Sequence, residues 1–387
     1  EECLTKKKAL FLLTGLGLLL SLLLMPYKAA PAKEQEMLFA GSTVCAYAGK
    51  GGVEVSAVAA ALYEAETGRL LFARNAQARL AMASTTKIMT AAVALKYGQP
   101  DSEFVVPKEA TGIEGSSIYL TEGECFTQRE LLYALMLESG NDAAVALAMA
   151  VAGSVEGFVA LMNATAAELG LKDTHFENPH GLSVDGHYTT AAELAKISAY
   201  AFGLEGFESV VSTVTMRLDG DDRHCQRYLV NHNKLLRSYD GMIGVKTGYT
   251  KAAGRCLVTA VRRGQMTLIA VTLNAPADWR DHTAMLDYGF SAFRMELVCK
   301  AGEKAAVPVE NGGKTSVTAI CAEDAWLCLP TDATVTRAFV TAPVRAPIAR
   351  GDAIAGLRIY ENGVFIKEIP LVSRSDVPAR GKRIWER

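Results

Sequence analysis

The stretch MASTTKIMTA, residues 82–91, places a lysine three residues after a serine in an otherwise apolar run. Residues three apart on a helix share a face, so the Ser84 hydroxyl and the Lys87 amine are expected to meet. Apolar neighbours lower the pKa of a lysine, which suits the amine to act as a base for the hydroxyl. The same spacing also fits an ordinary helix N-cap and a lysine that reaches solvent. Alone, the stretch leaves a catalytic and a structural interpretation open.

Two further motifs favour the catalytic interpretation. The sequence ESGNDAA places Ser139 and Asn141 at the end of a predicted helix, in a turn from which side chains can project into a cleft. The sequence GVKTGYT places Lys246, Thr247 and Gly248 at the start of a predicted strand. Each motif alone is an ordinary turn or strand end. In this order the three form the set typical of penicillin-binding proteins and class A β-lactamases.

The chain resembles the low-molecular-mass penicillin-binding proteins that act as D-alanyl-D-alanine carboxypeptidases, over roughly residues 50–375. Its Ser-Gly-Asn motif is the form that these carboxypeptidases favour. The stretches ARNAQARLAMASTTKIMTA, NPHGLSVDGHYTT and NAPADWRDHTAMLDYGF are similar to theirs as well. The resemblance implies an α+β fold, in which a β-lactamase/transpeptidase-like catalytic domain with an antiparallel sheet and a helical cluster precedes a small all-β sandwich domain. It implies a serine-type carboxypeptidase, and we expect no cofactor and no metal.

The resemblance also implies catalytic roles for five residues of this chain. Ser84 is the nucleophile that attacks the carbonyl between two terminal D-alanines, and water then hydrolyses the acyl-enzyme. Lys87 is the expected proton acceptor, although the identity of the base is disputed in this superfamily. Ser139 and Asn141 are expected to relay the proton to the leaving D-alanine and to hold the peptide amide. Lys246 supplies positive charge for the terminal carboxylate of the substrate.

Substrate binding is expected along the Lys-Thr-Gly motif. Lys246 and Thr247 bind the carboxylate, and Gly248 lets the substrate lie beside the strand. By resemblance, the backbone N–H groups of Ser84 and Tyr249 form the oxyanion hole. The expected partners are a peptidoglycan stem peptide that ends in D-Ala-D-Ala, and β-lactam antibiotics as covalent inhibitors.

Other polar residues have weaker claims to a role. His232 stands where some relatives carry an arginine, and Arg280 is a further candidate contact for the carboxylate. His180 and Asp185 lie in the loop NPHGLSVDGHY, for which a structural turn is the favoured interpretation. Glu177 stands without the Glu-x-x-Leu-Asn pattern of class A β-lactamases, so penicillin is expected to acylate the serine and to leave slowly.

Three other functions stay open. The acyl-enzyme can pass to an amine or to a cross-link, so D,D-endopeptidase or transpeptidase action is one alternative. A class A-like β-lactamase is disfavoured by the missing loop pattern and by the added β domain. A catalytically silent wall-binding protein is disfavoured because all the motif residues are intact. Nucleic-acid binding has no support from a formal net charge of −2.

The N-terminal residues have the layout of a secretory signal. Three lysines at 6–8 precede an uncharged apolar run over 9–25, and Ala30-Pro31-Ala32 follows as a small-residue cleavage site. We therefore expect a signal peptide over 1–32 and an extracytoplasmic location, with an uncleaved anchor as the alternative. Eight cysteines in an exported chain suggest disulfides, but their pairing cannot be derived, and buried thiols are the alternative.

The remaining chain divides into four predicted parts. A linker over 33–52 leads into the catalytic domain over 53–296, in which strands flank a helical middle section. Local signals there are a hairpin at 66–68, strands around 263–264, a helix from 84 to 97, helix starts at 127, 154 and 190, and a last helix near 278–288. A β-sandwich domain over 297–373 follows. The basic tail over 374–387 carries enough positive charge for weak membrane contact, although a solvated tail is favoured.

Overall fold

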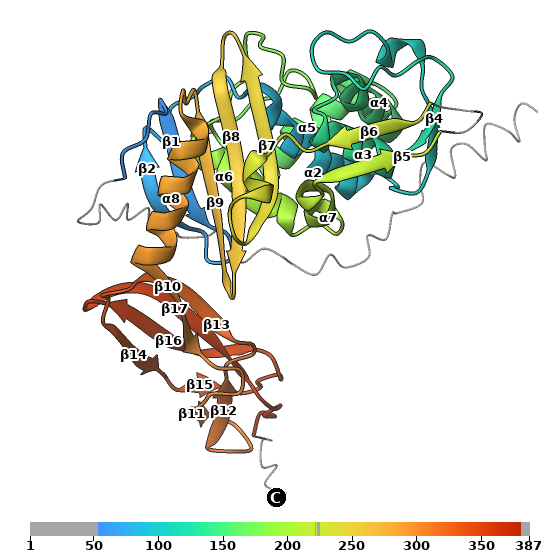
Figure 1. Cartoon of the computed structure of the whole chain (residues 1–387). Helices are drawn as coiled ribbons and strands as arrows, with labels where there is room; N and C mark the ends of the chain where they lie inside the picture. The colour runs from blue at the N-terminus through green and yellow to red at the C-terminus, as the bar shows by residue number, and fades with distance from the viewer. Residues whose placement is uncertain (1–52, 221, 223–224, 381–387) are drawn as a thin grey trace, which may run out of the picture. The chain divides into compact units, whose positions relative to one another are not determined.

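The computed structural model describes residues 53–220, 222 and 225–380 (Figure 1). The predicted signal peptide over 1–32 and the predicted linker over 33–52 lie outside the described residues. Within the described ranges, the first part of the chain folds around an antiparallel sheet with helices. The α+β class predicted from the sequence is confirmed.

A five-stranded antiparallel sheet supports the catalytic motifs, in the order β2-β1-β9-β8-β7. Its strands are β1 (Ala59–Glu64), β2 (Arg69–Arg74), β7 (Met242–Thr250), β8 (Gly254–Arg263) and β9 (Met266–Leu273). The predicted hairpin turns at 66–68 and 263–264 are confirmed as the β1–β2 and β8–β9 connections. The strand β7, which carries the Lys-Thr-Gly motif, is an outermost strand of this sheet.

Both faces of the sheet are buried, and each face uses alternate residues of the same strand. In β1, Ala59 and Ala61 belong to the core cluster shared with the helices, whereas Ala60 and Leu62 belong to a second cluster with helix α8 (Asp278–Ala292). Side chains alternate between the two faces of a strand, so a fully apolar strand is the expected sequence for a sheet covered on both sides. Figure 1 shows α8 lying across this sheet.

Three helices of the helical section begin where local capping signals predict, whereas the helix predicted from 84 starts at Lys87, after a 3₁₀ turn over 83–86. Its helices are α2 (Lys87–Tyr97), α3 (Gln128–Leu137), α4 (Asn141–Ala152), α5 (Val155–Glu168), α6 (Ala191–Phe202) and α7 (Phe207–Ser212). The Thr127 hydroxyl accepts a hydrogen bond from the Glu130 N–H, and the Glu130 carboxylate accepts one from the Thr127 N–H, forming a capping box. The Ser154 and Thr190 hydroxyls cap α5 and α6 by accepting hydrogen bonds from the N–H groups of Gly157 and Glu193. All three predicted helix starts are confirmed.

Replacing Thr127 by alanine removes one half of this capping box and leaves a helix N–H without its acceptor. We expect the free energy of unfolding to fall by about 1 kcal/mol, as for other N-cap substitutions. Denaturant unfolding of the variant beside the parent measures the change. Ser291→Ala, which removes an exposed hydroxyl in the last turn of α8, serves as the control and should stay within about 0.5 kcal/mol. Equal stability of both variants would contradict a stabilising role for the box.

Several elements differ from the sequence prediction. Helix α4 starts at Asn141 itself, where only a turn was predicted. The start was not predicted because Gly140, which precedes it, has no side chain to form a cap. Strand β7 starts at Met242, so Lys246 lies in the middle of the strand and not at its start. The short elements β3 (Glu103–Val105), η2 (Lys108–Ala110), β4 (Cys125–Thr127), β5 (Thr215–Leu218), β6 (Arg227–Val230) and η3 (Lys234–Arg237) were not predicted.

In the described ranges, no single helix is both long enough and apolar enough to cross a membrane. Helices α4 and α5 satisfy length and composition only when they are joined, and they bend by 84° at the break between them. Buried residues of both helices, such as Ala146 and Phe158, belong to the core cluster of the helical section.

An all-β domain follows α8, as predicted. A six-stranded sheet has the order β14-β16-β17-β12-β11-β15, and β10 pairs with β13. These strands are β10 (Phe293–Cys299), β11 (Lys304–Glu310), β12 (Ser316–Ile320), β13 (Ala325–Pro330), β14 (Val335–Val340), β15 (Val344–Arg345), β16 (Ala353–Glu361) and β17 (Val364–Ser373). Val377 is buried and bridges to Ile348, so the chain packs on this domain beyond residue 373, where a solvated tail was expected.

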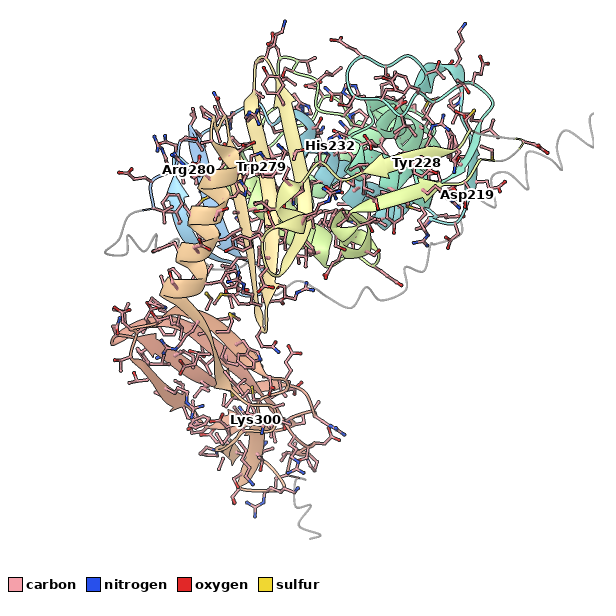
Figure 2. The ribbon with its side chains drawn as sticks, viewed as in Figure 1. Asp219, Tyr228, His232, Trp279, Arg280 and Lys300 are labelled. Carbon is pink, nitrogen blue, oxygen red and sulfur yellow. The ribbon has the colours of Figure 1, made fainter. Side chains whose placement is uncertain are left out.

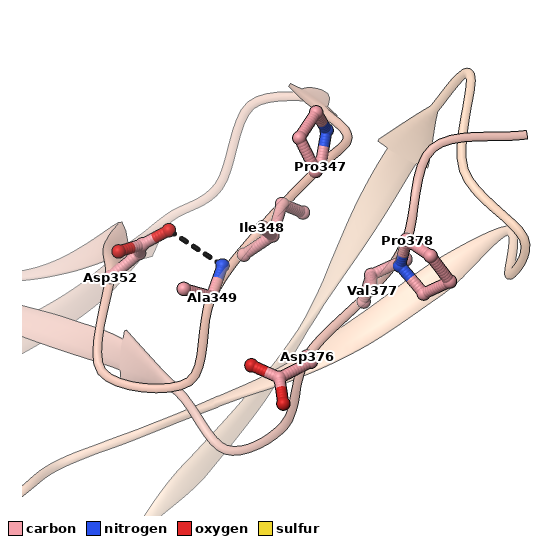
Figure 3. Close-up of a pocket in the computed structure, with 7 residues that line it drawn as sticks. All are labelled: Pro347, Ile348, Ala349, Asp352, Asp376, Val377 and Pro378. Carbon is pink, nitrogen blue, oxygen red and sulfur yellow. Dashed lines mark hydrogen bonds between the residues drawn. The ribbon is translucent and has the colours of Figure 1, made fainter.

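A hollow in the β domain lies between the segments 347–352 and 376–378 (Figure 3). Its two carboxylates already have partners within the turns that form it. Asp352 accepts a hydrogen bond from the Ala349 N–H at 2.7 Å, and Asp376 accepts one from the Arg350 N–H at 2.8 Å. Asp352 therefore closes a turn of the backbone, and Asp376 joins the two segments to each other.

The described cysteines favour the alternative of buried thiols over disulfides. Of the six, only Cys225 is exposed. Burial raises the pKa of the Cys256 thiol to about 11, so this group stays protonated at neutral pH. Cys3 and Cys45 lie outside the described residues.

Candidate active site

Ser84 projects from a tight turn that leads into α2. This turn, η1 (Ala83–Thr86), begins at Ala83 with a φ of +47°, which is an unfavourable conformation for a residue with a Cβ. Two hydroxyls hold the turn: Thr85 donates to the Met82 carbonyl at 2.6 Å, and Thr86 donates to the Ala83 carbonyl at 2.8 Å. Ser84 therefore stands in a turn whose strained start is held by local hydrogen bonds.

The Lys87 amine lies next to the Ser84 hydroxyl, as the spacing predicts. Lys87 is fully buried, and its Nζ lies 3.0 Å from Ser84 Oγ, 2.7 Å from Asn141 Oδ1 and 2.6 Å from the backbone oxygen of His180. Burial lowers the pKa of Lys87 well below its ordinary value, and the nearby Lys246 lowers it further. The amine is therefore held in the environment that a lysine base requires.

The partners of Lys87 determine where its lone pair points. The Asn141 amide nitrogen donates to the Glu114 carbonyl, so the amide oxygen faces Lys87. This oxygen and the His180 carbonyl can only accept hydrogen bonds. A neutral amine has two N–H bonds, and both are taken by these two acceptors. Its lone pair is left for the Ser84 hydroxyl, which is the arrangement needed to remove the hydroxyl proton.

The Ser-Gly-Asn turn joins α3 to α4 and is buried. Ser139 has a φ of +63° and Asn141 starts the next helix, so the two side chains come from a constrained turn. Asp142, to which sequence analysis gave no role, supports this region. Its buried carboxylate accepts hydrogen bonds from the Ser117 hydroxyl at 2.6 Å and from the backbone N–H groups of residues 118 and 120. The carboxylate thereby holds a neighbouring loop against α4.

Strand β7 presents the Lys-Thr-Gly motif beside the serine turn. Lys246 is buried and donates to the Thr247 carbonyl at 3.0 Å. Burial lowers the pKa of Lys246 to about 7, and the carboxylate of Glu138 opposes part of this change. A Cβ on Gly248 would lie 2.9 Å from the Ser84 nitrogen, closer than side-chain atoms pack. Only glycine lets β7 lie this close to the Ser84 turn.

Replacing Gly248 by alanine should therefore push β7 and the Ser84 turn apart. We expect acylation of Ser84 to slow by about 10²-fold, since a displacement of about 1 Å between reacting groups has effects of this size. Stopped-flow acylation with a chromogenic β-lactam measures the rate. Gly313→Ala is the control, because its Cβ would lie 3.6 Å from the nearest atom and the acylation rate should stay unchanged. A parent-like rate in Gly248→Ala would show that the strand adapts.

The side chains of the remaining candidates have partners other than Ser84 and Lys87, or are exposed. His232 Nε2 is 3.3 Å from the Glu138 carboxylate, next to the Ser-Gly-Asn turn. The Arg280 side chain is 75% exposed, and the ion pair that it forms among the described residues is with Asp281 at 3.9 Å. Figure 2 shows His232 and Arg280 on different elements, with Arg280 on α8. Tyr249 is exposed, as a residue that contributes only its backbone can be.

The loop over 172–190 takes part in the site through its backbone. The Thr90 hydroxyl donates to the Pro179 carbonyl at 2.6 Å, one residue before the carbonyl of His180 that meets Lys87. The loop sequence favours a plain structural turn and does not predict this contact, because a backbone carbonyl has no signature in residue type. Asp185 is exposed, and Glu177 pairs with the His175 ring at 3.1 Å. Among the described His, Cys, Asp and Glu residues, no group of three is arranged to hold a metal ion.

Comparison with known proteins gives consistent matches over most of the chain. A family model for D-alanyl-D-alanine carboxypeptidase matches residues 46–277, and a model for the C-terminal domain of penicillin-binding protein 5 matches residues 293–379. The D-alanyl-D-alanine carboxypeptidase DacF of Bacillus subtilis is 33% identical over 362 residues, which cover 89% of this chain and 92% of that protein.

Solved structures show the same likeness. Penicillin binding protein 5 from Haemophilus influenzae matches with a TM-score of 0.76 and 28% identity, covering 85% of this chain and all of that one. The Streptomyces K15 DD-transpeptidase matches with a TM-score of 0.58 and 36% identity, covering 62% of this chain and 98% of that one.

Proposed function

Because the chain belongs to the D-alanyl-D-alanine carboxypeptidase family of serine peptidases, we propose that Ser84 is its nucleophile and Lys87 its general base. The protein is a penicillin-binding D-alanyl-D-alanine carboxypeptidase, with D-Ala-D-Ala peptides of peptidoglycan as substrate and β-lactams as ligands. The observation that carries the assignment of residues is the set of three contacts around the buried Lys87 amine.

The proposed reaction begins with transfer of the Ser84 proton to the lone pair of Lys87. The hydroxyl oxygen attacks the carbonyl between the two D-alanines, and the backbone N–H groups of Ser84 and Tyr249 stabilise the developing oxyanion. Collapse of this intermediate breaks the peptide bond and gives an ester on Ser84. The proton that Lys87 took from Ser84 passes through Ser139 to the leaving amine, and D-alanine departs. Water then gives a proton to Lys87 and attacks the ester, and the shortened peptide leaves as a carboxylic acid while Lys87 returns the proton to Ser84.

Recognition of the terminal carboxylate is assigned to β7. Lys246 supplies a positive charge, the Thr247 hydroxyl donates a hydrogen bond, and Gly248 leaves room for the peptide beside the strand. Support for this assignment comes from the buried position of Lys246 and from the outermost position of β7 in its sheet. Asn141 is assigned two tasks, to orient Lys87 and to hold the substrate amide.

The class A-like β-lactamase alternative is disfavoured by the loop geometry. Glu177, its only candidate for a water-activating carboxylate, pairs with His175 and packs against the turn at Gly186. Transpeptidation shares the acyl-enzyme and is tested as an outcome below. The silent wall-binding alternative conflicts with the assembled Ser84–Lys87–Asn141 contacts.

We also propose the finer aspects of location and organisation. The lysines and the apolar run over 6–25 support a signal peptide over 1–32, and penicillin-binding relatives are consistent with an extracytoplasmic location. A linker over 33–52, a catalytic domain over 53–296 and a β domain from 297 remain the proposed division. The proposed weak membrane contact rests on the basic residues after 373.

The proposed function is tested by incubating the purified protein with a fluorescent penicillin and, separately, with a pentapeptide that ends in D-Ala-D-Ala. We expect a stable adduct on the peptide that contains Ser84, found by mass spectrometry, together with release of D-alanine. Absence of both would contradict the assignment. Fast turnover of penicillin would indicate a β-lactamase, and transfer of the acyl group to an added D-amino acid would reveal transpeptidation.

A further inference from the structure

His187 is a buried histidine that joins the loop over 172–190 to the turn that carries the nucleophile. Its Nε2 lies 2.8 Å from the Thr86 hydroxyl, and its Nδ1 lies 3.0 Å from the backbone N–H of Glu177. Thr86 is the residue directly before Lys87 and bonds in turn to the Ala83 carbonyl. The imidazole therefore connects the loop to both ends of the serine turn.

The hydrogen bonds fix the tautomer of this imidazole. A backbone N–H can only donate, so Nδ1 accepts from Glu177 and carries no proton. The proton is then on Nε2, which donates to Thr86, and the Thr86 hydroxyl passes the chain on to the Ala83 carbonyl. Burial lowers the pKa of His187 to about 4, with His180 and His175 adding to the effect, so the neutral ring persists at neutral pH.

The loop that His187 holds carries a backbone carbonyl that accepts a hydrogen bond from Lys87, the proposed base. The His180 carbonyl lies 2.6 Å from Lys87 Nζ, and a Cβ on Gly181 would lie 2.0 Å from the Ala83 oxygen, so the loop packs directly on the serine turn. A small shift of the loop would move the His180 carbonyl away from Lys87. One N–H group of the Lys87 amine would then have no acceptor. The lone pair would then no longer be directed at Ser84.

We propose that His187 is a positioning residue for the acylation step, which holds the His180 carbonyl on Lys87 and so directs the lone pair of that amine at Ser84. The inference rests on the proposed function, because it requires Lys87 to act as the base. His187 does not contact the nucleophile or the base itself. Its action passes through Thr86 and the loop backbone.

Other groups around the imidazole do not replace this link. The Phe176 ring packs edge to face on the His187 ring, with 5.8 Å between the ring centroids. This contact orients the imidazole but forms no hydrogen bond to the serine turn. The charged or titratable groups near it are His175, His180 and Glu177 of the same loop, and Lys87 lies next to His180. The Thr90 hydroxyl, which donates to the Pro179 carbonyl, also lies 3.4 Å from the Thr86 carbonyl and is a weaker, parallel link between the loop and α2 that stays in place when His187 is replaced.

The test compares His187→Leu with His187→Gln in the full protein. Leucine removes both hydrogen bonds, whereas glutamine can accept from Glu177 with its oxygen and donate to Thr86 with its nitrogen. We expect His187→Leu to lower the maximal acylation rate by a chromogenic β-lactam about 10²-fold, with little change in the dissociation constant of the non-covalent complex. His187→Gln should recover most of the rate. The matched control is His175→Gln, an exposed histidine of the same loop that should acylate like the parent.

A second pair of variants addresses the path of the effect and remains informative if His187→Leu fails to fold. Thr86→Val should slow acylation as His187→Leu does, Thr86→Ser should not, and the double variant should be no slower than either single one. Parent-like acylation in Thr86→Val, or a glutamine variant as slow as a folded leucine variant, would overturn the inference. If the parent itself forms no adduct, the proposed function fails instead, so the two failures are distinguishable.

Discussion

Replacing Ser84 by alanine is expected to remove all covalent labelling by penicillin and to lower D-alanine release by about 10⁶-fold, the size of effect found when a serine nucleophile is deleted. In the proposed mechanism this hydroxyl forms the ester, and without it the Lys87 amine 3.0 Å away has no proton to accept. Mass spectrometry follows the adduct, and a coupled D-amino acid oxidase assay follows the released D-alanine.

Ser291→Ala serves as the matched control, since it removes an exposed hydroxyl from α8. Both variants should melt like the parent, so that lost labelling reports chemistry and not unfolding. Persistent labelling of Ser84→Ala at another residue would contradict the assignment of the nucleophile. Retained D-alanine release without an adduct would point to direct attack by water.

Replacing Lys87 by methionine is expected to lower the acylation rate by about 10²- to 10⁴-fold, the usual contribution of a positioned base. Methionine fills similar space but cannot accept the Ser84 proton, and it leaves the Asn141 and His180 oxygens without their donor. Stopped-flow acylation measures the rate. Lys96→Met is the control, because Lys96 lies on the same helix and pairs with Glu168 near the surface. Equal rates in the two variants would exclude Lys87 as the base.

The two buried lysines should give opposite pH effects in the parent. In the proposed mechanism Lys87 acts when neutral, and its pKa is lowered well below the ordinary value, so acylation should rise with pH as Lys87 loses its proton. Lys246 is proposed to act when charged, and its pKa is lowered to about 7, so KM for a peptide carboxylate should rise as pH increases above about 7. A β-lactam ester without a free carboxylate should keep the first effect and lose the second. If ester and acid respond alike, Lys246 does not bind the carboxylate.

The parts of the fold that the sequence predicted well are those with local causes. The capping box at Thr127 and the N-caps at Ser154 and Thr190 satisfy helix N–H groups within one turn, so neighbouring residues are enough to locate them. Helix α4 has no such cap, and its start at Asn141 is fixed by the burial of Asp142 against a loop more than 20 residues away. Strand β7 extends back to Met242 because it pairs with β8, which is a tertiary cause.

The candidate site divides in the same way. Helical spacing alone brought Ser84 and Lys87 together, and resemblance supplied the other two motifs. The His180 carbonyl and the His187 imidazole were not predicted, because they reach Lys87 and Thr86 from about 90 to 100 residues further along the chain. A backbone acceptor can be any residue, and a buried histidine has many possible partners. The folded structure is needed to show which carbonyl contacts Lys87 and which groups contact the histidine.

The position of β7 at the margin of its sheet bears on how drug resistance can arise. In the proposed complex, the oxyanion of a β-lactam is held by the backbone N–H groups of Ser84 and Tyr249, and every residue except proline carries such a group. Exchanging the Tyr249 side chain therefore leaves these two hydrogen bonds in place. Displacing the strand weakens them, and Gly248, where an added Cβ would meet the Ser84 nitrogen at 2.9 Å, is a place where a single substitution does so. That displacement also slows the proposed reaction on D-Ala-D-Ala peptides. A substitution at Gly248 that reduces β-lactam binding is therefore expected to reduce carboxypeptidase activity as well.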